Sequence, residues 1–213
     1  MQKYFSVLAA ACAVLFLVSC ATSPSEKADF SPPLPEIIPE RPEKPEKPRP
    51  PENILGMGLV SVEKLAAFFL WNNPVAHANF VEGLSVMYIE EAAAEGVNHD
   101  VAFAQMCLET GFLRYGGLVT PGMNNFCGLG AIGPGQPGHV FPDPRTGVRA
   151  HIQHLKAYAS DEPLNKKLVD PRYRYVRLGS SPTIYGLAGT WAADRLYSGK
   201  IAGILQRLYE FAF

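Results

Sequence analysis

Glu109 is the acid in this sequence whose surroundings best suit proton-transfer chemistry. It lies in the last turn of a predicted helix that starts at Asn98 or His99 and that Gly111 ends in a left-handed conformation. Apolar residues keep helical spacing along this segment and also fill its other sides, so little of the helix can face water. Burial and the negative end of the helix dipole both disfavour a carboxylate there. We therefore predict a raised pKa for Glu109, which is what a general acid needs.

A solvated surface position is the ordinary alternative for a glutamate on a helix. Three features of the chain favour a functional site instead. The helix around Glu109 is apolar, the position is costly for an ion, and a glycine-rich segment that carries Asn124 and Asn125 follows directly. A long irregular segment inside a compact domain is often functional, so we expect this segment to border a site.

Metal, cofactor and nucleotide chemistry find no support in the sequence, and we predict neither a cofactor nor a metal. His151 and His154 lie three residues apart on one predicted helix, but zinc needs further ligands and no H-E-x-x-H pattern occurs. Packing or surface roles are therefore predicted for both. No serine lies in a nucleophile-elbow pattern, and no glycine pattern typical of phosphate binding is present. A net charge of −1 gives no reason to expect a nucleic-acid partner.

Three motifs in the second half of the chain resemble one known family. Residues 104–111, AQMCLETG, are similar to the A-Q-x-x-x-E-[ST]-G signature of the bacterial glucosaminidase-domain family, glycoside hydrolase family 73. Residues 124–129, NNFCGL, resemble its N-N-x-F-G-I segment, with Cys127 where the family often has Phe. Residues 191–201, WAADRLYSGKI, resemble its W-A-T-D-x-x-Y-x-x-K-[IL] segment. The matches occur in the family's order and cover most of residues 80–213.

The resemblance implies a mainly α, lysozyme-like helical domain with a small glycine-rich loop or β lobe. It also implies an endo-β-N-acetylglucosaminidase that cleaves the GlcNAc–MurNAc β-1,4 bond in peptidoglycan glycan strands. Glu109 matches the family's catalytic acid, and Asn124 and Asn125 match the segment that lines the cleft. Tyr197 matches a tyrosine near the catalytic site, and Trp191, like Asp194, matches a residue that supports this region.

Three further aromatic residues, Tyr115, Phe126 and Tyr185, are candidates for stacking on sugar rings. Core positions are an equally ordinary role for aromatic residues, so both readings stay open.

The second catalytic group is not assigned by the resemblance, because the family's lobe often carries its second acid where this chain has glycines and prolines. Asp143 is the first candidate, and Asp161 and Asp194 are weaker ones. The 2-acetamido group of the substrate is the alternative nucleophile. Our hypothesis is that Glu109 is indispensable and that no second carboxylate is equally so.

Two other functions remain as alternatives. A lytic transglycosylase shares the fold and a glutamate at the same helix end. A non-catalytic peptidoglycan-binding lipoprotein on a degenerate hydrolase scaffold is the other, and a sealed cleft or a cation paired with Glu109 would mark it.

Helices are the elements expected to position these residues, with Ser61 and Ser181-Pro182 as start signals and Gly96 as a stop. On the second helix, Glu90, Glu91 and Glu95 fall on the face predicted to be solvated. The segment 114–147 is predicted as loop with at most a small hairpin, and residues 139–141 are the candidate for a short strand. The predicted helices cover residues 60–71, 80–95, 99–110, 146–158, 181–192 and 201–208.

The N-terminal part of the chain is predicted to direct export and lipid attachment. Lys3 and the apolar run 4–18 form a signal peptide, and residues 17–21, LVSCA, resemble a bacterial lipobox with Cys20 as the acylated residue. An ordinary cleaved signal peptide is the alternative. The prediction is an exported monomer, anchored to a bacterial membrane through lipidated Cys20. Its segments are a signal peptide at 1–19, a proline-rich linker at 20–52 and a catalytic domain at 53–213.

Cys107 and Cys127 remain after removal of the signal peptide, in an oxidising compartment. They lie on two segments that must approach each other to form the cleft. We therefore predict a disulfide between them, with two buried free thiols as the alternative.

Overall fold

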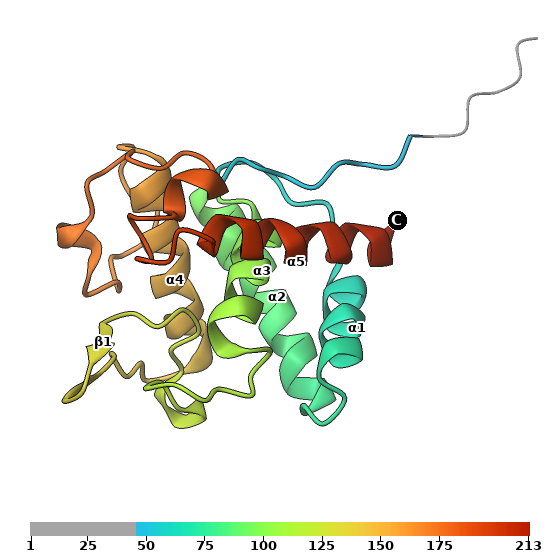
Figure 1. The fold of residues 1–213 in the computed structure, drawn as a ribbon, viewed down its shortest axis with the longest axis horizontal. Coiled ribbons are helices and arrows are strands. Elements are labelled where there is room, and N and C mark those ends of the chain that lie inside the picture. The colour runs from blue at the N-terminus through green and yellow to red at the C-terminus, as the bar shows by residue number, and fades with distance from the viewer. Residues whose placement is uncertain (1–45) are drawn as a thin grey trace, which may run out of the picture. The chain divides into compact units, whose positions relative to one another are not determined.

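The computed structural model describes residues 46–213. The predicted signal peptide, the lipidation site Cys20 and most of the linker lie outside the described residues. The described part contains five α-helices, three short 3₁₀ helices and one antiparallel sheet of two strands (Figure 1). The predicted mainly α, lysozyme-like fold is confirmed. The elements are α1 (Val62–Asn72), α2 (Ala78–Glu95), α3 (His99–Thr110), η1 (Pro121–Met123), β1 (Ala131–Gly133), β2 (Gln136–Pro137), α4 (Pro144–Ala159), η2 (Tyr173–Tyr175), η3 (Ile184–Leu187) and α5 (Tyr197–Ala212).

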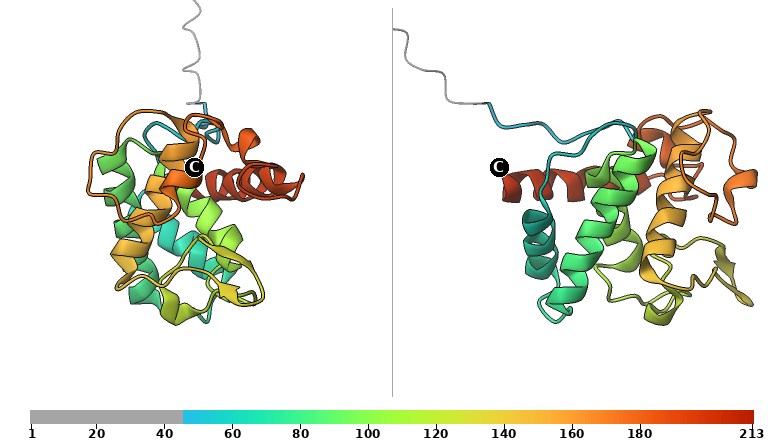
Figure 2. Two further views of the ribbon diagram at one scale, coloured as in Figure 1. Left: turned by 90° about the vertical axis from the view of Figure 1, so that its left-hand side faces the viewer. Right: turned by 180° about the vertical axis from the view of Figure 1, so that it is seen from behind.

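Helix α3 lies at the centre of the domain, where it packs against α2, α4 and α5 (Figures 1 and 2). The side chain of Asn98 caps its N-terminus by accepting hydrogen bonds from the backbone N–H groups of Asp100 and Val101. Gly111 ends the helix in the left-handed conformation, with φ of 57°. Both predicted ends are confirmed. Apart from Leu108 and Glu109, every residue of α3 is buried, as its apolar sequence predicts.

The local signals for the first two helices also hold. Ser61 caps α1 by accepting from the backbone N–H of Lys64, and Gly96 ends α2 with φ of 74°. Aromatic rings from α1, α2 and α3 then meet in the core, where Phe103 contacts Phe69 and Tyr88 edge-on. This packing fixes α3 and therefore the position of its C-terminal end. No helix among residues 46–213 is long and apolar enough to cross a membrane.

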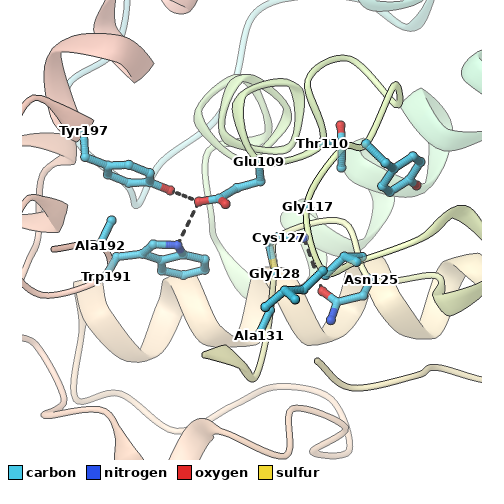
Figure 3. A pocket seen from close by; sticks show the side chains of 13 residues that line it. Glu109, Thr110, Gly117, Asn125, Cys127, Gly128, Ala131, Trp191, Ala192 and Tyr197 are labelled. Atoms are coloured by element: carbon cyan, nitrogen blue, oxygen red, sulfur yellow. Dashed lines mark hydrogen bonds between the residues drawn. The ribbon is translucent and has the colours of Figure 1, made fainter. Parts of the chain in front are cut away.

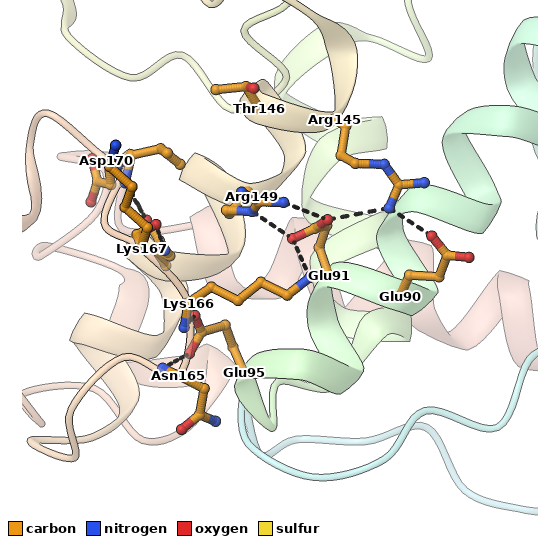
Figure 4. Close-up of polar contacts among 12 residues, drawn as sticks. Glu90, Glu91, Glu95, Arg145, Thr146, Arg149, Asn165, Lys166, Lys167 and Asp170 are labelled. Carbon is orange, nitrogen blue, oxygen red and sulfur yellow. Dashed lines mark hydrogen bonds and ion pairs between the residues drawn. The ribbon is translucent and has the colours of Figure 1, made fainter.

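The prediction that all three glutamates of α2 face solvent is wrong for two of them. Glu90 is exposed, but Glu91 is 0 % and Glu95 2 % exposed. Glu95 forms an ion pair with Lys156 of α4 at 3.0 Å, and Glu91 is surrounded by cations (Figure 4). The apolar pattern of α2 identified one buried face, but the polar face is covered by α4 and the segment after it.

The boundaries of the loop-rich parts differ from the prediction. The small hairpin expected in this segment is present as β1 and β2, but these are the only paired strands in the described chain, so residues 139–141 form no strand. Helix α4 starts two residues earlier than expected, at Pro144. Residues 181–192 form only the short η3 rather than a helix, because the Ser181 hydroxyl bonds to the Gly186 carbonyl and the backbone turns at Gly189 with φ of 85°. A start signal was present there without a helix to follow it.

Candidate active site

The C-terminal end of α3 opens into a pocket of about 410 Å³. Three parts of the chain meet around it: the end of α3, the lobe of residues 115–131, and the segment 191–197 before α5 (Figure 3). Five of the residues predicted for the site line this pocket, and they are Glu109, Tyr115, Asn125, Trp191 and Tyr197. Segments far apart in the sequence thus converge on the predicted acid.

The two carboxylate oxygens of Glu109 have different surroundings. Oε1 accepts a hydrogen bond from the Tyr197 hydroxyl and one from the indole nitrogen of Trp191 at 3.1 Å (Figure 3). Oε2 faces the loop at Gly128, where a Cβ atom would lie 3.6 Å from it. Gly128 has φ of 71°, a conformation that favours glycine. One oxygen is therefore held by donors, and the other is next to a loop that lines the pocket.

The pKa of Glu109 is raised above its ordinary value, as predicted. Burial is the main cause, and the hydrogen bonds from Tyr197 and Trp191 partly oppose it because they favour the carboxylate. No cation among residues 46–213 forms an ion pair with Glu109, and no Lys, Arg or His lines the pocket. The surroundings therefore favour a protonated carboxyl group at a higher pH than usual, which suits a general acid.

The two asparagines shape the loop rather than present free amides. Asn125 is 1 % exposed; its Nδ2 donates to the carbonyls of Leu129 and His139, and its Oδ1 accepts from the Leu129 N–H. Asn124 donates to the Phe141 carbonyl, has φ of 51°, and is absent from the pocket lining. Asn125 thus lines the pocket as predicted with its polar atoms already used, whereas Asn124 only supports the loop.

Among the candidate stacking residues, Tyr115 and Phe126 have opposite positions, and Tyr185 is exposed and absent from the pocket lining. Phe126 is 1 % exposed and belongs to the main hydrophobic core, so it is unable to stack on a sugar. Its segment packs closely against α4, because Gly147 has no side chain and the Asn124 carbonyl can approach it. Tyr115 does line the pocket, and its φ of 55° is an unusual conformation for a tyrosine. Burial raises the pKa of its hydroxyl to about 12, so it stays a neutral donor.

Comparison with known proteins agrees with this geometry. Residues 85–210 match the sequence model of the Glucosaminidase family, described as mannosyl-glycoprotein endo-beta-N-acetylglucosaminidase. The match covers more than half of the chain and includes the whole of α3, α4 and most of α5. The chain belongs to the glucosaminidase family. A protein from Borreliella burgdorferi described as uncharacterized is 43 % identical over 158 residues, which are 74 % of this chain and 78 % of that protein.

Asp143 caps helix α4 instead of lining the pocket. It is exposed, and it accepts hydrogen bonds from the backbone N–H of Thr146 at 2.8 Å and from the Thr146 hydroxyl. The expectation that Asp143 takes part in catalysis is therefore not supported by its position. Asp161 is exposed, and Asp194 is exposed and paired with Lys200 at 2.7 Å; neither lines the pocket.

Asp143→Ala is expected to lower the free energy of unfolding by about 1 kcal/mol, because α4 loses its N-cap acceptor. The turnover number on peptidoglycan should stay close to that of the wild type. Asp143→Asn keeps an acceptor at the cap and is the matched control, with stability near wild type. Urea unfolding and a turbidity assay measure the two effects. A loss of turnover as large as that of a Glu109 variant would identify Asp143 as the second acid.

The predicted disulfide is wrong, because Cys107 and Cys127 are both free and buried. Cys107 belongs to the main core and borders a groove against α5, whereas Cys127 belongs to a smaller cluster with Leu129 and Phe141. The two thiols therefore lie in different apolar clusters. Burial raises the pKa of each thiol well above its usual range, which keeps both unreactive.

Labelling of the unreduced protein with a thiol reagent should show this directly. Denatured protein is expected to carry the label on both Cys107 and Cys127 in a peptide map, whether or not it was reduced first. Native protein should label slowly, since both side chains are buried. Labelling of the two cysteines only after reduction would show that they form the disulfide after all.

Two residues of the site were not singled out from the sequence. Gly128 was noted only as part of a motif, and its position beside Glu109 Oε2 is visible only in the structure. Gln105 donates a hydrogen bond from Nε2 to the Tyr197 hydroxyl oxygen at 2.8 Å and is 0 % exposed. It is a long polar side chain within a helix that is otherwise apolar there, and such a residue must find buried partners.

Proposed function

We propose that this protein is a peptidoglycan hydrolase, an endo-β-N-acetylglucosaminidase that cleaves the GlcNAc–MurNAc β-1,4 bond with Glu109 as general acid. The observation that carries the proposal is the carboxyl group of Glu109. It has a raised pKa, is held by Tyr197 and Trp191, and faces an open pocket in a member of a glycoside hydrolase family.

In the first step, Glu109 donates its proton to the glycosidic oxygen while the bond between that oxygen and the anomeric carbon breaks. Negative charge then develops on the Glu109 carboxylate. Tyr197 and Trp191 already donate to Oε1, so these hydrogen bonds strengthen as the charge develops and need no reorganisation. Tyr197 and Trp191 thus support the acid in its ionised state.

The group that attacks the anomeric carbon is proposed to come from the substrate. Glu109 is the only carboxylic acid that lines the pocket within residues 46–213. Glycosidases with two catalytic carboxylates place them roughly 5–9.5 Å apart, which requires both to face one cleft. The acetamido oxygen of GlcNAc would bond to the anomeric carbon, and water would later open this ring, with Glu109 accepting the proton of the water.

Mass analysis of the products tests the proposal. Purified peptidoglycan digested by the protein should yield fragments with reducing GlcNAc ends. Anhydro-MurNAc ends would instead identify a lytic transglycosylase, for which a single acid also suffices. Binding to peptidoglycan without any new ends would identify the non-catalytic alternative. The pocket is open, and no cation among the residues that the structure describes pairs with Glu109; a sealed cleft or such a cation would have supported that alternative.

We also propose that the protein is exported and attached to a bacterial membrane through lipidated Cys20, with the proline-rich segment as a spacer toward the cell wall. Cells fed a labelled fatty acid should incorporate the label into the wild type but not into Cys20→Ala. Incorporation of the label into Cys20→Ala to the same extent as into the wild type would contradict the anchor.

A further inference from the structure

A chain of hydrogen bonds between buried side chains leads from the interior of the domain to Glu109. Tyr88 of α2 bonds to His151 Nδ1 of α4 at 2.9 Å, and His151 Nε2 bonds to Gln105 Oε1 at 2.9 Å. Gln105 Nε2 donates to Tyr197, which donates to Glu109 Oε1. Tyr88, Gln105 and His151 are 0 % exposed. Four elements of the fold thus contribute one residue or more to a single connected network.

The chemistry of each group fixes the direction of the network. An amide nitrogen only donates, so Gln105 Nε2 uses the oxygen of Tyr197 as acceptor, and the single hydroxyl proton of Tyr197 goes to Glu109. The amide oxygen only accepts, so the His151 proton is on Nε2. Burial lowers the pKa of His151 to about 3, so the ring is neutral and Nδ1 accepts from Tyr88. Every bond therefore points toward Glu109.

The opposite direction leaves a buried proton without a partner. With the Gln105 amide turned over, His151 would accept at Nε2 and donate from Nδ1 to the oxygen of Tyr88. The Tyr88 hydroxyl proton would then need another acceptor, and His151 is its only hydrogen-bonding partner within residues 46–213. An unsatisfied buried donor costs on the order of 1–3 kcal/mol, so the stated direction is preferred.

We propose that Tyr88, His151 and Gln105 are positioning residues that keep Tyr197 a donor to Glu109 Oε1, so that the transferable proton stays on Oε2. Oε1 already accepts from both Tyr197 and Trp191, which uses its two lone pairs. Oε2 faces the pocket at Gly128. The inference rests on the proposed role of Glu109 as acid, and it explains how the proton is presented to the cleft rather than to the interior.

The pocket lining around Glu109 contains no Lys, Arg or His and no second acid within residues 46–213. The hydrogen-bond network is therefore the main influence on the Glu109 pKa that a substitution can change. Tyr197 and Trp191 come from one side, and Cys127 and Gly128 come from the loop. Tyr115 lines the same pocket. Burial raises the pKa of Tyr197 and of the Cys127 thiol well above their usual ranges, so both are neutral at the pH where Glu109 titrates.

Titration of the Glu109 carboxyl by NMR tests the inference in the free protein. Protein labelled with ¹³C at the glutamate side-chain carboxyl gives one resonance that is missing in Glu109→Gln, which assigns it. Gln105→Met removes the donor that orients and polarises the Tyr197 hydroxyl, so the Glu109 pKa is expected to rise by about half a unit or more. Tyr88→Phe removes only the far end of the network and should cause a smaller rise.

Gln153→Met is the matched control. Gln153 is also 0 % exposed and loses three hydrogen bonds on substitution, to the Lys167 carbonyl and the N–H groups of Val169 and Asp170. No chain of hydrogen bonds runs from these groups to Glu109; the link is the packing of His154, which bonds to Asp170, against Trp191. The pKa of Glu109 should therefore change much less in this variant than in Gln105→Met. An equal shift in Gln153→Met, or a wild-type pKa in folded Gln105→Met, overturns the inference.

Two further features keep the test decisive. If Gln105→Met fails to fold, Tyr88→Phe decides alone, and an unchanged Glu109 pKa there overturns the proposal. The titration needs no substrate, so it separates the network from the proposed activity. A protein without hydrolase activity whose Glu109 pKa shifts in Gln105→Met would retain the network and lose the proposed function. In an active enzyme, the alkaline limb of the pH–rate profile should move up by the same amount.

Discussion

Glu109→Gln is expected to reduce the turnover number on peptidoglycan by about 10²–10⁴-fold, the range typical for loss of a general acid. Gln has nearly the same shape and keeps an oxygen that accepts from Tyr197 and Trp191, but it carries no proton that can pass to the glycosidic oxygen. The Michaelis constant should change little, because the contacts to the substrate remain. Release of soluble fragments, followed over time by mass analysis, measures the effect.

The pH dependence of the wild type supports the same assignment. A general acid must be protonated, so the turnover number should fall as pH rises through the raised pKa of Glu109. The folded state binds this proton more tightly than the unfolded chain does, so the contribution of Glu109 to stability is lost as pH rises. Above neutral pH the wild type must hold an ionised carboxylate in a buried position, which lowers its stability. Glu109→Gln has no charge there and is therefore expected to be at least as stable as the wild type above neutral pH.

A stability measurement thus serves as the control for the activity loss. An inactive and well-folded Glu109→Gln would place the defect in the chemistry rather than in folding. Turnover close to wild type in this variant would contradict the role of Glu109, whatever the products of the enzyme are.

Glu91→Ala is expected to lower the free energy of unfolding by about 3–5 kcal/mol, the range for removing one partner of a buried ion pair. Arg149 binds the Glu91 carboxylate with two hydrogen bonds of 2.8 and 3.1 Å, and Arg145 and Lys166 each add one of 3.2 Å (Figure 4). The Glu91 side chain is 1 % exposed, whereas Arg149, Lys166 and Arg145 are 25, 35 and 41 % exposed, so water reaches these cations only in part after the substitution. The substitution leaves three cations without the carboxylate that ties α4 and the segment after it to α2.

The effect of pH on this variant follows from the Glu91 pKa, which the cations lower to about 2. Because the pKa in the folded state is below that in the unfolded state, the stabilisation is fully present above about pH 4.5 and is lost as pH falls toward 2. The difference in stability between wild type and Glu91→Ala should therefore be large at neutral pH and shrink in acid. Urea unfolding followed by circular dichroism at several pH values measures it.

Glu90→Ala is the matched control, since Glu90 is one residue away, is exposed and pairs with the same Arg145 at 2.6 Å. Exposed ion pairs contribute little, so a loss below about 1 kcal/mol is expected. Equal losses in the two variants would show that burial of Glu91 does not determine the energetics of this cluster.

Local sequence was sufficient for the helix that carries the acid. Asn98 and Gly111 act within one turn of the helix, and caps of this kind depend on neighbours in the chain. The apolar residues around Glu109 required burial, and burial is the main cause of its raised pKa. The motifs around Glu109, Asn125 and Tyr197 also indicated which distant segments belong to one site.

The partners of polar residues were decided only by the tertiary structure. The cations that surround Glu91 lie more than fifty residues further along the chain, so the periodicity of α2 carried no sign of them. Cys107 and Cys127 are on adjacent segments but in different apolar clusters, and no spacing rule separates these outcomes.

The same holds for the hydrogen bond between Gln105 and His151, which joins two helices that each carry a buried polar side chain. A sequence pattern states which faces of a helix avoid water. Which charged or hydrogen-bonding groups complete those faces depends on how the helices pack against one another, and only the assembled fold contains that information.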